Sequence, residues 1–261
     1  MSIAKINNIN CYYEVHGEGR PLVLIGGLAS DSQSWQFVLD KLKKHFQVIV
    51  FDNRGVGKTQ YPDASFDIAV LAKDAVMLLD YLEIGNADIL GHSMGGYIAQ
   101  EIAITYPRRV NNLILASTAA FTSARNRFLF TNMLKILEKN IPYDLFLKEF
   151  MCWLFTPEYF EDKEKIDEFI KYALSYPYRQ TIDGFRKQVE IYNKYSSYER
   201  LDRIKAETLV IAGEKDILIT RDDTELLASR ISKVAVKYIE GAAHSLPIEV
   251  PEDFVSEILE R

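Results

Sequence analysis

Short, almost wholly apolar runs alternate with longer amphipathic stretches along most of the chain. The apolar runs are rich in Val, Ile and Leu, and several end at Gly or Asp, which is typical of buried strands. They cover residues 9–15, 21–26, 46–52, 86–91, 111–118, 207–213 and 234–241. Helical spacing marks the stretches between and after them, at residues 34–45, 67–82, 95–107 and 251–261.

The alternation of strand and helix predicts a parallel sheet covered by helices on both faces. The clearest helical face follows from the apolar positions Ile68, Leu71, Ala72, Ala75, Leu78, Leu79 and Leu82. A tight turn at residues 16–21, HGEGRP, joins the first two apolar runs. Because so short a connection suits antiparallel neighbours, we expect an antiparallel edge at the start of the sheet.

Between residues 121 and 200 the strand pattern stops, and helical segments dense in Phe, Tyr and Trp take over. The apolar run at 207–213 then resumes the sheet. An all-helical insert between two sheet strands predicts a lid over one edge of the sheet. We therefore predict an α/β core formed by residues 1–120 and 201–261, and a helical cap formed by residues 121–200.

Composition narrows the class of protein. Of the 261 residues 48% are hydrophobic and 26% charged, as in an ordinary globular protein, and no apolar stretch approaches the roughly 18 residues of a membrane span. The net charge is −6 and no long Lys/Arg cluster occurs, which argues against nucleic-acid binding. Cys11 and Cys152 lack metal-type spacing, so we predict a reduced, cytoplasmic protein with buried cysteines and no membrane partner.

The hexapeptide GHSMGG at residues 91–96 lies between an apolar run and an amphipathic stretch. Gly91, Ser93 and Gly95 match the G-x-S-x-G nucleophile elbow, in which a sharp strand-to-helix turn lifts a serine hydroxyl above a sheet. The glycines let strand and helix approach closely, and the helix start favours negative charge beside the serine. Ser93 is therefore the predicted nucleophile.

A serine hydroxyl is a weak nucleophile that needs a base. Of the four histidines, His92 adjoins the serine and should point away from it, His16 precedes a turn, and His45 ends a charged helix. His244 follows the last apolar run, at the carboxyl end of a strand, where open α/β sheets bind their ligands. We predict that His244 is the base.

The acid that orients this histidine should also follow a strand. Asp216 lies just beyond the apolar run 207–213. Asp222 and Asp223 come later and suit helix capping, and Glu214 is a weaker alternative. Asp216 is therefore the predicted acid.

The oxyanion of acyl transfer needs backbone donors. One is predicted to be the N–H of Met94, directly after the nucleophile. The second should come from the loop at residues 26–35, and we select the N–H of Leu28, with Ala29 as the alternative.

These motifs together resemble the α/β-hydrolase superfamily over nearly the whole chain. GHSMGG resembles its elbow, GEKD at 213–216 its acid loop, and GAAHS at 241–245 its histidine loop. FDNRGVGKT at 51–59 is similar to its D-x-R-G-x-G-x-S turn, where we interpret Asp52 and Arg54 as structural. The resemblance implies an eight-stranded, mostly parallel sheet with a cap after strand 6, and its chain order is Ser93, Asp216, His244.

The resemblance implies a serine hydrolase, a carboxylesterase that cleaves a small ester through an acyl-enzyme and needs no metal or organic cofactor. Lactone, carbon–carbon, carbamate or amide hydrolysis, and perhydrolysis, stay open because fold and triad do not separate them. A slow ligand receptor is a further alternative. Dehalogenases and epoxide hydrolases are disfavoured, since they have Asp where Ser93 stands. Candidate pocket residues in the cap are Phe121, Phe128, Trp153 and Phe155.

Overall fold

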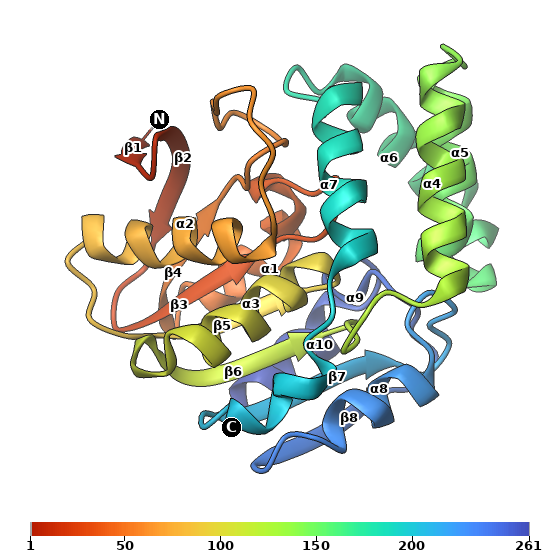
Figure 1. Cartoon of the computed structure of the whole chain (residues 1–261). Coiled ribbons are helices and arrows are strands. Elements are labelled where there is room, and N and C mark those ends of the chain that lie inside the picture. The colour runs from red at the N-terminus through yellow and green to blue at the C-terminus, as the bar shows by residue number, and fades with distance from the viewer. Residues whose placement is uncertain (1, 261) are drawn as a thin grey trace.

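The computed structural model describes residues 2–260, so Met1 and Arg261 of the predicted core lie outside the described residues. The described chain forms one eight-stranded sheet in the order β1-β2-β4-β3-β5-β6-β7-β8 (Figure 1). The strands are β1 Ser2–Ile6, β2 Ile9–His16, β3 Arg20–Ile25, β4 Phe46–Phe51, β5 Ala87–His92, β6 Val110–Ala116, β7 Glu207–Gly213 and β8 Val234–Ile239. β1 with β2 and β2 with β4 pair antiparallel, and all later pairs are parallel, which confirms the mostly parallel fold.

Burial explains why the central strands read as continuous apolar runs. β5 is buried at every position except His92, because helices cover both of its faces. The edge strand β8 instead alternates between half-buried and exposed residues along most of its length. The apolar runs thus mark the central strands, whose carboxyl ends carry the loops of interest.

Helices cover the sheet in two layers (Figure 1). α2 (Ile68–Tyr81), α3 (Met94–Thr105) and α8 (Arg221–Ala228) share one hydrophobic core, whereas α1 (Gln36–Leu42), α9 (Leu246–Glu249) and α10 (Pro251–Leu259) share the other. The predicted helix at 34–45 begins as a short 3-10 turn, η1 (Ser32–Trp35), before α1. Asp67 caps the start of α2, because its side chain accepts a hydrogen bond from the N–H of Val70.

The chain between β6 and β7 is helical in the structure. It contains α4 (Ala124–Glu138), α5 (Tyr143–Leu154), η3 (Pro157–Glu161), α6 (Lys163–Ser175), α7 (Ile182–Lys194) and η4 (Tyr198–Arg203). We call residues 121–200 the insertion. Its α4, α5, α6 and α7 stand beyond the carboxyl ends of the central strands (Figure 1). An isolated bridge between Phe121 and Ser196 brings its two ends together.

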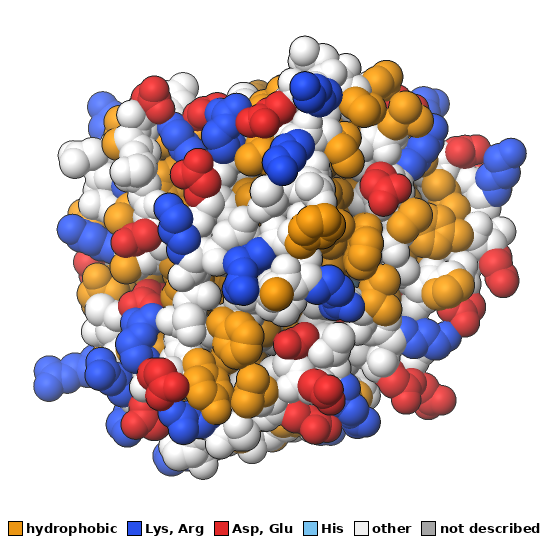
Figure 2. All heavy atoms as spheres, turned by 45° about the vertical axis from the view of Figure 1, so that its right-hand side comes forward, with side chains coloured by type: hydrophobic (Ala, Val, Ile, Leu, Met, Phe, Trp, Pro, Cys, Tyr) orange, Lys and Arg blue, Asp and Glu red, His pale blue; other side chains and the backbone are white. Residues whose placement is uncertain are grey.

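The outer surface of the insertion is partly apolar. Phe128, Leu145, Tyr172 and Leu174 are exposed there, and Figure 2 shows hydrophobic side chains among acidic and basic ones on the side it brings forward. Cys11 is buried as expected, but Cys152 is exposed. Leu147, Met151 and Phe155 form the buried face, so Cys152 turns outward. None of the helices in the described part of the chain is long and apolar enough to cross a bilayer.

Candidate active site

Ser93 stands at the turn between β5 and α3. Its backbone angles are φ 55° and ψ −120°, a conformation that non-glycine residues rarely adopt and that occurs at functional turns. A Cβ at Gly95 would overlap the backbone of Ile25, and one at Gly96 would overlap Thr118. The glycines predicted to allow close packing at this turn are therefore required by the neighbouring backbone and side chains.

Ser93, His244 and Asp216 are joined in series. His244 Nε2 lies 3.0 Å from Ser93 Oγ, and His244 Nδ1 lies 2.8 Å from Asp216 Oδ2. The other carboxylate oxygen of Asp216 accepts the N–H groups of Leu218 (2.8 Å) and Ile219 (2.9 Å). Because the backbone fixes one oxygen, the second is aimed at the imidazole.

The structure places the three residues on loops at the carboxyl ends of β5, β7 and β8. His244 and Asp216 are 3% and 6% exposed, so their hydrogen bond is shielded from water. This arrangement can transfer a proton from the serine hydroxyl to the imidazole and stabilise the resulting imidazolium.

His92 is directed to the histidine loop and makes no hydrogen bond to the serine. Its Nε2 lies 2.9 Å from the carbonyl oxygen of His244, which only accepts, so Nε2 carries the proton. Burial, and secondly the adjacent His244, lower the pKa of His92 to about 4. His92 is therefore neutral at pH 7 and anchors the loop of His244.

The loop after β3 lies against the serine. A Cβ at Gly27 would come within 3.1 Å of Ser93 Cβ. The N–H of Ala29 donates to Gln188 Oε1 at 3.1 Å, whereas the N–H of Leu28 makes no hydrogen bond to another described residue. Met94 begins α3, so its N–H has no partner within that helix. Of the two loop amides considered, Leu28 is thus the one that is unengaged.

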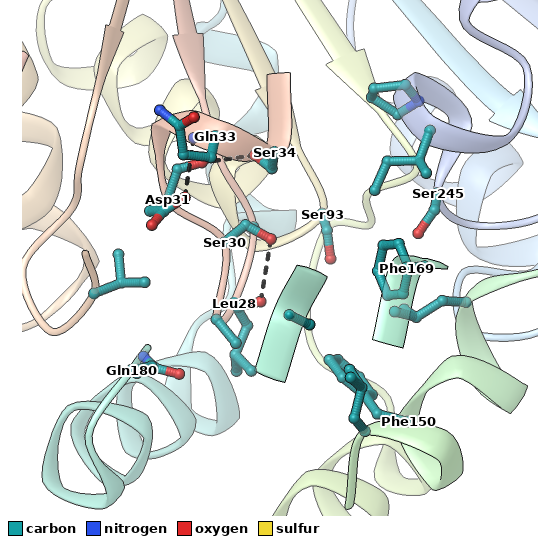
Figure 3. Close-up of a pocket in the computed structure, with 18 of the residues that line it drawn as sticks. Leu28, Ser30, Asp31, Gln33, Ser34, Ser93, Phe150, Phe169, Gln180 and Ser245 are labelled. Atoms are coloured by element: carbon teal, nitrogen blue, oxygen red, sulfur yellow. Dashed lines mark hydrogen bonds between the residues drawn. The ribbon is translucent and has the colours of Figure 1, made fainter. Parts of the chain in front are cut away.

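A cavity of about 230 Å³ opens above Ser93 and His244. Figure 3 shows Ser93 pointing into the space between Leu28 and Ser30 on one side and Phe169 and Ser245 on the other. The insertion supplies an apolar wall that includes Phe130, Tyr143, Phe146, Leu147, Phe150, Phe155 and Phe169. Part of the remaining rim is polar and includes Ser30, Asp31, Gln33, Ser34 and Gln180.

Asp31 and Tyr176 meet at this polar rim. The Tyr176 hydroxyl donates to Asp31 Oδ2 at 2.5 Å, and burial raises the pKa of Asp31. Both residues line the cavity, and Asp31 comes from the loop after β3, whereas Tyr176 comes from the insertion.

Three of the four predicted pocket aromatics lie off the cavity. Phe155 lines it, but Phe128 is 73% exposed on α4, Phe121 packs on Tyr198, and Trp153 packs against the larger core. None of these three residues lines the cavity, so the expectation for them is wrong.

The charged side chains of Asp52 and Arg54 stabilise the turn at residues 51–59. Asp52 accepts the N–H groups of Ser32 (2.8 Å) and Lys58 (2.7 Å). Arg54 forms a buried, two-point ion pair with Asp74, with Nη2 to Oδ1 at 2.9 Å and Nε to Oδ2 at 2.5 Å. Neither Asp52 nor Arg54 lines the cavity, which agrees with their structural interpretation.

Sequence reasoning missed the side chains that tie the insertion to the histidine loop. Glu249 Oε1 accepts the N–H of Thr156 at 2.9 Å and its hydroxyl at 2.6 Å, while Glu249 Oε2 accepts the N–H of Ala243 at 2.9 Å. The N–H of Ser245 also donates to the carbonyl of Leu154 at 3.1 Å.

Within residues 2–260, no three His, Cys, Asp or Glu side chains are grouped as a metal site.

A serine on a strand–helix turn, bonded to a histidine and an aspartate on later loops of a mostly parallel sheet, is the arrangement of an α/β hydrolase. The chain matches the family model of the α/β hydrolase fold over residues 20–251 and therefore belongs to this family.

Several similar proteins carry the names of hydrolases, and this chain is a hydrolase of the same family. It is 30% identical to 3-oxoadipate enol-lactonase 2 of Acinetobacter baylyi, over 93% of this chain and 89% of that protein. It is 26% identical to a protein of Azorhizobium caulinodans that carries the name of a carbamate hydrolase, RutD, over 97% and 95%. The crystal structure of the enol-lactonase from Burkholderia xenovorans LB400 superposes with a TM-score of 0.89 at 25% identity, over 99% and 98% of the two chains.

Proposed function

We propose that this protein is a serine hydrolase that cleaves small carboxylic esters through an acyl-enzyme. Ser93 is the nucleophile, His244 the general base and Asp216 the acid that orients it. The observation that carries the proposal is the continuous hydrogen-bonded series from Ser93 Oγ through the imidazole to the Asp216 carboxylate.

In the first step the Ser93 hydroxyl attacks the ester carbonyl and passes its proton to His244 Nε2. The carbonyl oxygen becomes negative and accepts hydrogen bonds from the N–H groups of Leu28 and Met94. The imidazolium then gives its proton to the leaving alcohol as the tetrahedral intermediate collapses. Water, activated by the same histidine, hydrolyses the acyl-enzyme by the reverse sequence.

The cavity supports a small and partly apolar substrate. Its volume of about 230 Å³ is below the roughly 300–1,000 Å³ that is usual for drug-sized ligands. The apolar wall suits an acyl or alcohol group without charge, and the insertion would act as its cap. Since Cys11 and Cys152 are both unpaired, we further propose a reducing, cytoplasmic setting.

A lactone is the second candidate substrate. The likeness to enol-lactonases favours it, at 30% identity in one relative and a TM-score of 0.89 in one structure. A lactone is a cyclic ester, so the same residues and the same oxyanion donors would open it. The carbamate hydrolase name of another relative adds a third bond type to test.

The test is steady-state hydrolysis of 4-nitrophenyl esters of increasing acyl length, of simple lactones and of a carbamate, by wild type and by Ser93→Ala. We expect sustained turnover that disappears in the variant, with the highest kcat/KM on short acyl chains. Wild-type rates in Ser93→Ala would disprove the mechanism, and a burst of one product per enzyme without turnover would favour a receptor.

A further inference from the structure

Gln188 is a fully buried glutamine on α7 of the insertion, and its side chain bonds to the loop after β3. Its exposed fraction is 0%. Its Oε1 accepts the N–H of Ala29 at 3.1 Å, and its Nε2 donates to the carbonyl of Arg54 at 3.0 Å. Because a backbone N–H only donates and a carbonyl only accepts, these two bonds fix the orientation of the amide.

The backbone of α7 is built to bring Gln188 this close. A Cβ at Gly184 would overlap the carbonyl oxygen of Gly55, and Gly55 itself has φ 88°. Gln180, just before α7, donates through Nε2 to the carbonyl of Gly55 and to Gln188 Oε1, both at 2.9 Å. The glutamine is thus held from both the insertion and the core.

The bond to Ala29 matters because that residue is strained. Its φ of 61° lies in the left-handed region, which costs a non-glycine residue on the order of 1–3 kcal/mol and persists only where the surroundings fix it. With the Ala29 N–H engaged, the adjacent N–H of Leu28 is left for a substrate oxygen. Gly27 in the same loop lies against Ser93, so a small shift of this loop changes the distance from that N–H to the reacting carbon.

We propose that Gln188 is a positioning residue that holds the oxyanion loop, so that α7 of the insertion fixes the second oxyanion donor. The inference rests on the proposed acyl-transfer function. It predicts that loss of Gln188 weakens binding of the transition state and leaves ground-state binding of the substrate nearly unchanged.

The main variant is Gln188→Met, which keeps the volume and removes all three hydrogen bonds of the amide, to Ala29, Arg54 and Gln180. On a short 4-nitrophenyl ester we expect kcat to fall about tenfold to a hundredfold, the range for a displaced catalytic group, with KM near the wild-type value. A trifluoromethyl ketone, which adds to a serine to form an oxyanion, should bind more weakly by the factor lost in kcat/KM.

Gln100→Met is the matched control. Gln100 is also 0% exposed, accepts from the Ser197 hydroxyl at 2.6 Å and donates to the carbonyl of Ala119 at 3.0 Å, but it bonds to no oxyanion residue. We expect both variants to lose thermal stability and only Gln188→Met to lose kcat. Equal losses of kcat in the two variants, or a change in KM alone, would overturn the proposal.

Gln188→Glu gives a second test, which decides the matter if the methionine variant does not fold. The carboxylate still accepts from Ala29 but faces the Arg54 carbonyl without a proton; the protonated acid restores the donor. Burial beside a carbonyl raises the pKa of a carboxyl group. The ratio of variant to wild-type kcat should therefore rise as the pH is lowered, and a flat ratio in folded protein contradicts a positioning role.

Ser93→Ala, measured alongside, separates the two claims. If Ser93→Ala is inactive and Gln188→Met retains wild-type kcat, the proposed function stands and this inference is wrong. If Ser93→Ala is active, the proposed function itself fails.

Discussion

Replacing Asp216 by asparagine should abolish most activity because the surrounding backbone dictates how the new amide lies. Oδ1 of Asp216 accepts two N–H groups, from Leu218 and Ile219. In an asparagine only the side-chain oxygen can accept these two N–H groups, so its NH₂ group must face His244 Nδ1. The imidazole then accepts at Nδ1 and carries its proton on Nε2, which faces the Ser93 hydroxyl and no longer accepts its proton.

The size of the effect follows from this change of tautomer. The corresponding change in a serine hydrolase triad lowers kcat about 10⁴-fold. Since each factor of ten is about 1.4 kcal/mol, the barrier should rise by roughly 5 kcal/mol. Stability should change little, because the substitution keeps the shape of the side chain and both backbone hydrogen bonds.

The assay is kcat on a 4-nitrophenyl ester, with thermal unfolding measured in parallel. Asp223→Asn is the matched control. The Asp223 carboxylate accepts from Thr220 in a helix capping box and lies outside the series of bonds to the serine. We expect it to keep wild-type kcat. Activity of Asp216→Asn within tenfold of wild type would refute the assignment of Asp216 as the acid. A large loss of kcat in Asp223→Asn would refute the choice of Asp216 over Asp223.

Three further outcomes follow from buried groups. The pKa of His92 is about 4 in the fold and 6.5 in the unfolded chain, so the folded state binds fewer protons between these two pH values. The protein therefore loses up to about 3 kcal/mol of stability as the pH falls from 6.5 to about 4. His92→Gln should flatten this pH dependence of stability in urea titrations. Asp74→Ala leaves the buried Arg54 guanidinium without its counter-ion and should cost about 3–5 kcal/mol in the same assay, with no recovery at high salt. In Gly96→Ala the new methyl group overlaps Thr118, so stability should fall by about 1–3 kcal/mol, and the melting temperature and kcat should fall with it. Gly85→Ala, whose methyl group meets open space, should leave kcat unchanged.

The fold was predictable because its strands are buried on both faces. Continuous apolar runs such as 86–91 arise where helices cover both sides of a strand, so each run marks a strand and each strand end marks a loop. The G-x-S-x-G pattern then locates Ser93, and the two later loops bring Asp216 and His244 to it. These predictions needed only local patterns and the rule that parallel strands end on the same side.

The lining of the cavity was not predictable in the same way. Phe128 and Phe130 are two residues apart on α4, and only Phe130 faces the cavity, because residues two apart on a helix point in different directions. The local sequence shows that both residues are aromatic. It does not show which side of the helix packs on the rest of the protein. The same reason placed Cys152 outside the core.

Long-range polar partners also escaped prediction, although one left a trace. Gln188 falls on the apolar stripe of α7 with Phe185, Val189 and Tyr192, at helical spacing. A glutamine on a buried stripe requires partners for its amide, which is the signal that could have pointed to it. Its actual partners lie 134 and 159 residues away in the chain, and no local pattern specifies them.

The two sides of the candidate site are thus attached to the insertion by different side chains. Gln188 holds the loop that presents the Leu28 N–H, and Glu249 with the Ser245 N–H holds the loop of His244 through Thr156 and Leu154. A helical segment that only covered a substrate would need neither connection. Because both catalytic loops take part of their anchoring from the insertion, substitutions in it should alter the rate of the chemical step as well as the choice of substrate. Exchange of the insertion between relatives therefore has to preserve these two anchors before it can transfer specificity.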